Sequence, residues 1–174
     1  MNHYHHGDLR RALLVAARAT LDAGGALSLR GVAREAGVSQ AASYRHFADK
    51  EALLAAVAEE GFDALRGCLK EAEALEPVEL RIRKLGAAYV RFAVQNRGWF
   101  RVMFGDQLDR SRHPACEAAA RAAFAVLSGA VTEAVRRGRM RGDPRDLTLM
   151  AWSLVHGMAH LMLDGQGLEA GLDP

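Results

Sequence analysis

Residues 28–54 read SLRGVAREAGVSQAASYRHFADKEALL, and this stretch decides the fold. A short apolar pattern starts after Ser28, breaks at Gly37 and starts again after Ser39. Serine commonly caps the start of a helix, and glycine readily adopts the left-handed conformation that a tight turn needs. The spacing therefore predicts two short helices joined at 36–38, the second running to about Phe47, as in a helix-turn-helix.

The helix expected after Ser39 begins with small side chains and ends with bulky ones. We expect its core side to hold Val38, Ala42 and Phe47. Its outward side then holds Gln40, Ala41, Ser43 and Tyr44. Small residues let a helix backbone approach a surface closely, and the DNA major groove is wide enough to admit a helix. An ordinary solvent-exposed helix would carry the same small residues, so the pattern alone is only moderately specific.

In such a groove each residue type has a role that its chemistry suits. Gln40 can hydrogen-bond a base edge and Ala41 can touch a thymine methyl. Tyr44, His46 and Lys50 would stand where the helix leaves the groove, placed to hold phosphates. The amides at the start of the next helix, near Lys50, would add to that anion site.

The composition is that of a helical, water-soluble protein. The chain has 174 residues, of which 50% are hydrophobic and only four are proline. No stretch approaches the roughly 18 apolar residues of a membrane span, and no secretory signal precedes the first helix. Two cysteines are too few for a disulfide scaffold. We therefore expect a cytoplasmic protein without a membrane partner.

Positive charge gathers at the N-terminal end. The first fifty residues hold seven lysines and arginines against four acidic residues, and four of the seven histidines. The remaining residues hold 16 basic and 17 acidic side chains. A polyanion would therefore meet the N-terminal part of the chain.

Apolar residues recur at helical spacing through most of the chain. We expect a first helix from Asp8 to the Gly24-Gly25 pair and a long fourth helix capped by Asp49. Further helices are expected at about 78–95, 114–137 and 146–165, with an aromatic segment at 99–104 and a loop at 105–113. No strand signal is present. The expectation is an all-α chain with a three-helix DNA-binding domain at 1–47, whose first seven residues form an arm, and a helical body at 48–174.

The motifs at 33–39, AREAGVS, and at 44–53, YRHFADKEAL, resemble the DNA-binding segment of TetR-type transcriptional regulators. So many fixed spacings over some thirty residues are a specific signal. Two local departures are Ala41, where a glycine is frequent, and Ser43, where an aliphatic residue is usual. The resemblance implies a regulator, most often a repressor, that binds a palindromic operator in double-stranded DNA and releases it when a small molecule binds.

The resemblance also assigns roles to individual residues. Tyr44, His46, Lys50 and the start of the second helix, with Ser28 and Arg30, would contact phosphates. Base reading would fall to Ser39, Gln40, Ala41 and Ser43. The arm, with Tyr4, His5, His6 and Arg10, would run along the backbone or enter the minor groove, although a disordered arm fits the sequence equally well.

The last expected helix carries WSLVHG at 152–157, which is similar to one branch of the same family with a Trp-x-x-Val-His-Gly motif. A single helix-turn-helix makes few contacts, so such proteins pair and read two half-sites about 34–36 Å apart. We expect a homodimer built on the apolar stripes of the last two helices. The predicted interface residues are Leu127, Val131, Val135, Leu154, Met158 and Leu161. An internal monomeric bundle would use the same stripes.

Aromatic and methionine side chains in the body suggest a cavity for an apolar or aromatic effector. The predicted lining is Phe62, Leu65, Tyr89, Phe92, Trp99, Phe100, Met103, Phe104, Phe124, Trp152 and His156. Such clusters are more often plain core than pocket; the family resemblance raises the pocket interpretation.

His156 and His160 stand one helical turn apart, as in a zinc protease helix. The glutamate that activates water is missing, because Gly157 occupies its position, and no third ligand follows at a fixed spacing. The chain also shows no phosphate-cradling glycine loop and no nucleophile elbow. We therefore expect no catalytic residues, no metal site and no cofactor. We interpret His156 as a buried, hydrogen-bonded packing residue and expect His160 to border the pocket or the interface.

Overall fold

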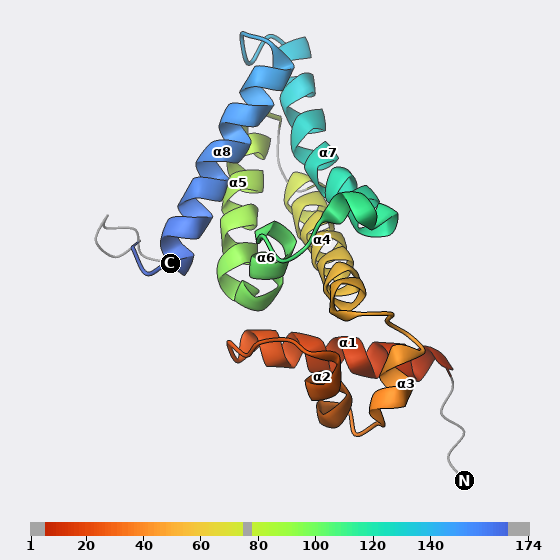
Figure 1. Cartoon of the computed structure of the whole chain (residues 1–174). Helices are drawn as coiled ribbons and strands as arrows, with labels where there is room; N and C mark the ends of the chain where they lie inside the picture. Colours follow the sequence, from red (N-terminus) through yellow and green to blue (C-terminus); the bar gives the residue numbers. More distant parts are fainter. Residues whose placement is uncertain (1–5, 75–77, 167–174) are drawn as a thin grey trace. The chain divides into compact units, whose positions relative to one another are not determined.

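A computed structural model describes residues 6–74 and 78–166 of the chain (Figure 1). All regular structure within these residues is helical. The helices are α1 (His6–Asp22), α2 (Leu29–Glu35), α3 (Gln40–Tyr44), α4 (Lys50–Ala74), α5 (Val78–Gln95), α6 (Arg97–Phe104), the 3-10 helix η1 (Arg110–Arg112), α7 (Pro114–Arg136) and α8 (Pro144–Leu163). The expected all-α fold is confirmed.

The expected helix starts at Ser28, Ser39 and Asp49 are confirmed by their hydrogen bonds. The Ser28 hydroxyl accepts from the amide of Gly31 at 3.0 Å, and that of Ser39 from Ala42 at 3.2 Å. The Asp49 carboxylate accepts from the amide of Ala52 at 2.7 Å. Each cap satisfies an amide that has no partner within its helix.

Two expected boundaries were wrong by a few residues, and one segment without an expected structure is a helix. Asp8 does not cap the first helix, because α1 already begins at His6. The α3 helix ends at Tyr44 rather than near Phe47, since the amide of Phe47 closes the turn on the carbonyl of Ser43. The aromatic segment is a helix, α6, and follows α5 after a single residue.

The chain forms two compact units. The first comprises Met1–Gly61 and Arg97–Glu117, and the second Phe62–Asn96 and Ala118–Pro174. The helix-turn-helix therefore shares its unit with the start of α4, α6 and the start of α7. The predicted domain boundary at residue 47 was placed at the end of the helix-turn-helix motif. The two compact units are instead defined by which residues pack together.

The first unit has a core that α1, α2 and α6 supply together. Leu13, Val32 and Phe100 are almost fully buried there. Glycine allows close approach at two points, because a methyl group at Gly98 would meet Leu21 at 2.8 Å, and one at Gly61 would meet the sulfur of Met103 at 2.6 Å. In the turn between α2 and α3, Gly37 has φ +69°, the left-handed conformation expected there.

In the second unit α5 and α8 pack along one another (Figure 1). Gly86 permits their close approach, since an added methyl group would lie 3.0 Å from Val155. Leu85 and Phe92 of α5 and Val131 of α7 fill the core.

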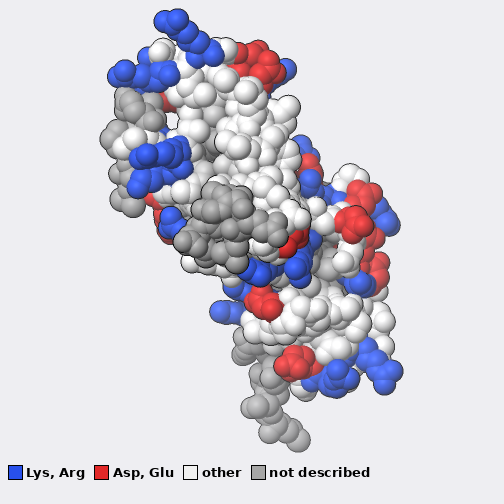
Figure 2. Space-filling model, turned by 90° about the vertical axis from the view of Figure 1, so that its left-hand side faces the viewer, with Lys and Arg blue, Asp and Glu red and all other residues white. Residues whose placement is uncertain are grey.

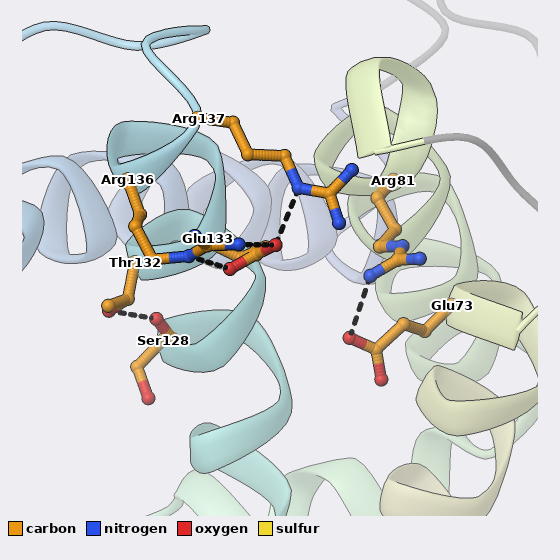
Figure 3. A network of polar contacts seen from close by, with 7 residues as sticks. All are labelled: Glu73, Arg81, Ser128, Thr132, Glu133, Arg136 and Arg137. Carbon is orange, nitrogen blue, oxygen red and sulfur yellow. Dashed lines mark hydrogen bonds and ion pairs between the residues drawn. The ribbon is translucent and has the colours of Figure 1, made fainter.

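Ion pairs tie helix ends in this second unit (Figure 3). At the end of α7, the Glu133 carboxylate accepts hydrogen bonds from Arg136 and Arg137, which lower its pKa to about 2. Arg81 of α5 lies 4.0 Å from Glu73 near the end of α4. Because these side chains are substantially exposed, the pairs add little to stability.

Within the described residues, α7 has the length and apolar composition of a membrane span, and 28% of its most apolar window is buried. One such helix is weak evidence for a membrane, because helices of water-soluble proteins also pass this test.

Candidate functional site

The α3 helix presents a small polar surface to solvent. Ser39, Gln40 and Ala41 are exposed, and half of the Tyr44 surface is accessible. The Ser39 cap holds the first turn, so that the Gln40 amide and the Ala41 methyl project from a fixed backbone. This surface can lie close to a partner and present one amide and one methyl group to it.

Ser43 does not belong to that surface, and its prediction as an outward residue was wrong. Its side chain is fully buried, and its hydroxyl donates to the carbonyl of Gln40 at 2.7 Å. The hydroxyl thereby finds a partner inside the same helix, which burial of a polar group requires. Ser43 occupies a core position, which agrees with the aliphatic residue that is usual there.

The end of α3 and the start of α4 carry the predicted phosphate contacts. Lys50 is exposed, and its ammonium lies 3.4 Å from the side-chain oxygen of Gln107. His46 is half-buried, while Phe47 is buried beneath the guanidinium of Arg10, 5.6 Å from the ring centroid. Arg10 thus has a packing contact within its own unit.

Ser28 and Arg30, the predicted residues at the start of α2, are both exposed. The Ser28 oxygen is engaged as the helix cap. Tyr4 and His5 of the arm lie outside the described residues, and His6 is the first residue of α1.

The predicted effector lining falls into two groups, one in each unit. The α6 group, Trp99, Phe100, Met103 and Phe104, belongs to the first unit. Phe100 and Phe104 pack with their centroids 4.8 Å apart, and the guanidinium of Arg18 covers Trp99 at 3.7 Å. Phe100 and Met103 are almost fully buried, so this group acts as core between α1, α4 and α6.

The remaining lining residues belong to the second unit and centre on a Tyr–His pair. The Tyr89 hydroxyl of α5 and Nδ1 of His156 on α8 are 2.7 Å apart. Trp152 stacks on His156 at 5.2 Å between centroids, and Phe124 meets Trp152 edge-on at 6.0 Å. Phe62, Leu65 and Phe92 are buried in the same unit.

Burial fixes the protonation of this pair near neutral pH. It raises the pKa of Tyr89, against a smaller lowering by a hydrogen bond from Trp152, so the phenol keeps its proton. Burial and then the nearby His160 lower the pKa of His156, which favours the neutral imidazole. The phenol and the imidazole are thus both neutral, and they share one hydrogen bond whose direction depends on the histidine tautomer. Trp152 and His156 of the α8 motif thus both engage one tyrosine of α5.

The two histidines of α8 also contact each other. His160 meets His156 edge-on, with centroids 4.7 Å apart, while Nδ1 of His156 is occupied by Tyr89. Over the described ranges, no three His, Cys, Asp or Glu side chains gather closely enough to hold a metal ion.

The predicted dimer residues differ in exposure. Leu154 is 74% exposed and Leu161 44%, so both can meet a second copy. Val131 is fully buried within the chain itself and presents no surface to a partner. The half-buried members are Leu127, Val135 and Met158.

The exposed apolar surface is larger than the sequence indicated. Met150 is 67% exposed, Leu149 56% and Phe124 43%. Met150, Leu154, Gly157 and Leu161 follow one another at spacings of four, three and four, which places them on one side of α8. That spacing is visible in the sequence, but a helix with apolar residues on several sides does not reveal which side faces its own core.

Two family models match the chain. Residues 13–57 match the bacterial regulatory proteins of the tetR family, and residues 82–174 match the tetracyclin repressor-like C-terminal domain. A protein of unknown function from Rhodococcus sp. RHA1 has a similar structure, with 38% identity and a TM-score of 0.84, over 95% of this chain and 88% of that one.

Two further relatives are more distant. The nucleoid occlusion factor SlmA of Marinobacter nauticus is 29% identical over 131 residues, which is 75% of this chain and 67% of the relative. The transcriptional regulator FadR of Bacillus subtilis, solved in complex with stearoyl-CoA, shares the fold. Its TM-score is 0.74 at 14% identity, over 90% of this chain and 88% of that one.

Proposed function

This chain belongs to the tetR family of bacterial regulatory proteins, and we propose that it is a cytoplasmic repressor. It binds a palindromic operator as a homodimer and leaves it when a small apolar or aromatic effector binds. The observation that carries the proposal is the surface of α3, where a capped helix presents Gln40 and Ala41 beside the exposed Tyr44 and Lys50.

The shape and chemistry of α3 suit the major groove. Its exposed start is small, so that the backbone can come close to base edges, and Gln40 offers a donor and an acceptor for them. Tyr44, at the end of α3, and Lys50, at the start of α4, then supply a hydroxyl and a cation for phosphates. Phosphate contacts set the affinity and base contacts set the preferred sequence.

The exposed side of α8 supports the homodimer. Between Asp146 and Asp164 this helix contains no lysine, arginine, aspartate or glutamate, and Leu154 and Met150 are mostly accessible. Figure 2, which views the molecule from the side on which α8 lies in Figure 1, shows a broad uncharged surface over the body. Apolar patches of this kind mark protein interfaces. A second copy, with the same patch, is the occupant that a twofold operator requires.

The Tyr89–His156 pair and its aromatic neighbours support an effector site in the second unit. An apolar or aromatic molecule would be held by the aromatic rings around this pair. The complex of FadR with stearoyl-CoA is an example of a ligand with a long apolar chain in this fold.

Release requires that the effector prefer a state that does not fit the operator. The α4 helix is continuous over 25 residues and contributes to both units, with Lys50 at its start and Leu65 in the second unit. An effector that displaces the body portion of α4 would move Lys50 and change the separation of the two α3 helices. The half-sites would then no longer match.

An electrophoretic shift assay with DNA from the region upstream of the protein's own gene tests the proposal. The wild-type chain should retard this DNA at low salt, and a Tyr44→Ala/Lys50→Ala double variant should not. Absence of retardation by the wild type, or equal retardation by the double variant, would contradict the proposed DNA surface.

A further inference from the structure

The first turn of α4 is held by a segment that lies far along the chain. Glu51 accepts a hydrogen bond from Arg112 at 3.0 Å, and its other oxygen lies 3.6 Å from Nε2 of His113. The neighbouring Lys50 meets Gln107 at 3.4 Å. Both of the first residues of α4 are therefore tied to residues 105–113, within one compact unit.

The 105–113 segment is itself fixed. Asp109 caps the short helix η1 by accepting from the amide and the hydroxyl of Ser111, and these bonds lower the pKa of its carboxyl group. Leu108 is buried, and the carbonyl of His113 accepts the amide of Glu117 in α7. Arg112 and His113 thus project from a braced backbone rather than from a free loop.

The first turn of α4 carries two adjacent opposite charges, on Lys50 and Glu51, which DNA would attract and repel respectively. A carboxylate beside Lys50 would repel a phosphate that the ammonium attracts. Arg112 compensates the Glu51 charge, while the neutral amide of Gln107 orients Lys50 and leaves its positive charge intact. The first turn of α4 can then present Lys50 as a net cation in a fixed place.

We propose that Arg112 is a positioning residue for DNA binding, and that it acts through Glu51 and not by touching DNA. The Arg112–Glu51 pair, with His113 beside it, sets both the placement and the local charge of the start of α4. Operator affinity therefore depends on a segment outside the helix-turn-helix. This inference rests on the proposed DNA-binding function.

A double-mutant cycle on the full-length chain tests the inference. The variants are Arg112→Gln, Glu51→Gln and their combination, with Arg101→Gln as a control that removes an exposed arginine from α6. Affinity for fluorescent DNA from the upstream region is measured by anisotropy at several salt concentrations, after circular dichroism has confirmed the helix content of each variant.

We expect Arg112→Gln to weaken binding roughly three- to fivefold, as loss of a largely exposed ion pair allows. The slope of log affinity against log salt should stay unchanged, because no phosphate contact is lost. The same substitution should have no effect in the Glu51→Gln background, and Arg112→Lys should restore most of the affinity. Arg101→Gln should bind like the wild type.

Three results would overturn the inference. A salt slope reduced by about 0.9 in Arg112→Gln would make Arg112 a direct phosphate contact. An equal loss in both backgrounds would show that Arg112 does not act through Glu51, and wild-type affinity of Arg112→Gln would show no role at all. Failure of the wild type itself to bind would instead remove the proposed function on which the inference rests.

Discussion

Two exposed helical surfaces of this chain are built on opposite principles. The α3 helix has five residues and presents small or polar side chains, with a tyrosine at its end and Lys50 at the start of the helix that follows. The α8 helix has twenty residues and presents leucine and methionine, with no acidic residue, lysine or arginine after Asp146. One surface keeps its polar groups accessible, and the other exposes side chains that water does not favour.

The difference indicates what each surface is suited to meet. Charged phosphates and base edges bind best to groups that form hydrogen bonds and expose little apolar area. Contact with a protein partner buries apolar area, which contributes a favourable free energy of about 25 cal/mol for each Å² removed from water. The α3 surface therefore fits nucleic acid, and the α8 surface fits a second copy of the chain.

The largest expected effect is on the α8 surface. Leu154→Glu would place a carboxylate at the proposed interface in both copies and forfeit about 3–6 kcal/mol for the two buried leucines. We expect a dimer at micromolar concentration to become a monomer in sedimentation velocity. Val15→Glu in α1 is the matched control, because Val15 is also an exposed apolar residue, at 62%. A dimer that survives Leu154→Glu would show that the partner surface lies elsewhere.

On the α3 side, Lys50→Ala should weaken operator binding about tenfold and lower the salt slope by about 0.9, the value for one phosphate contact. Tyr44→Ala should weaken binding by a similar factor with little change in slope, because a hydroxyl carries no charge. Neither variant should change the sedimentation coefficient. An unchanged salt slope in Lys50→Ala would mean that its ammonium does not reach DNA.

Substitution of two glycines distinguishes a helix surface that meets a partner, at Gly157, from a helix surface that meets water, at Gly67. An added methyl group meets nothing within 4 Å at Gly157 of α8 or at Gly67 of α4 in the single chain. In water, each Gly→Ala change should stabilise its helix by about 0.5–1 kcal/mol. We expect that gain in urea unfolding for Gly67→Ala alone. Gly157→Ala should weaken dimerisation, because the methyl group would intrude between subunits; a more stable Gly157→Ala dimer would place Gly157 in solvent.

The smallest expected effect is a pH dependence in the second unit. The lowered pKa of His156 means that the folded state favours the neutral imidazole more than the unfolded state does. This contribution to stability is complete above the unfolded pKa of about 6.5 and is lost as pH falls through the folded value. Urea unfolding at pH 7.5 and 5.5 should show a smaller acid-induced loss in His156→Gln than in the wild type.

Tyr89→Phe should leave most of this pH dependence in place, because burial, the main cause of the lowered pKa of His156, is kept. Identical acid-induced losses in the wild type and in His156→Gln would contradict this role for the imidazole.

The sequence predicted the helix-turn-helix well because its signals are local. Caps at Ser28, Ser39 and Asp49 and the left-handed Gly37 each depend on a few neighbouring residues. Ser43 was the exception. A serine can satisfy its hydroxyl on its own helix and enter the core, which its polarity alone does not reveal.

The body was harder to predict because its arrangement depends on residues far apart in the chain. The aromatic residues of α6 and those around Tyr89 look alike in the sequence, yet they belong to different units. The contacts of Glu51 with Arg112 and His113 span about sixty residues and leave no periodic trace. Val131 and Leu154 are likewise both apolar, yet Val131 lies in the core and Leu154 on the surface.

Binding of two subunits across one operator is the central claim, and the spacing of half-sites tests it most directly. DNA from the upstream region should show a protected palindrome with half-site centres about 34–36 Å apart and two chains bound per duplex. Insertion of about 5 bp between the half-sites turns one of them to the opposite side of the helix, and should abolish tight binding. Undiminished affinity for the lengthened site, or one chain per duplex, would contradict the account.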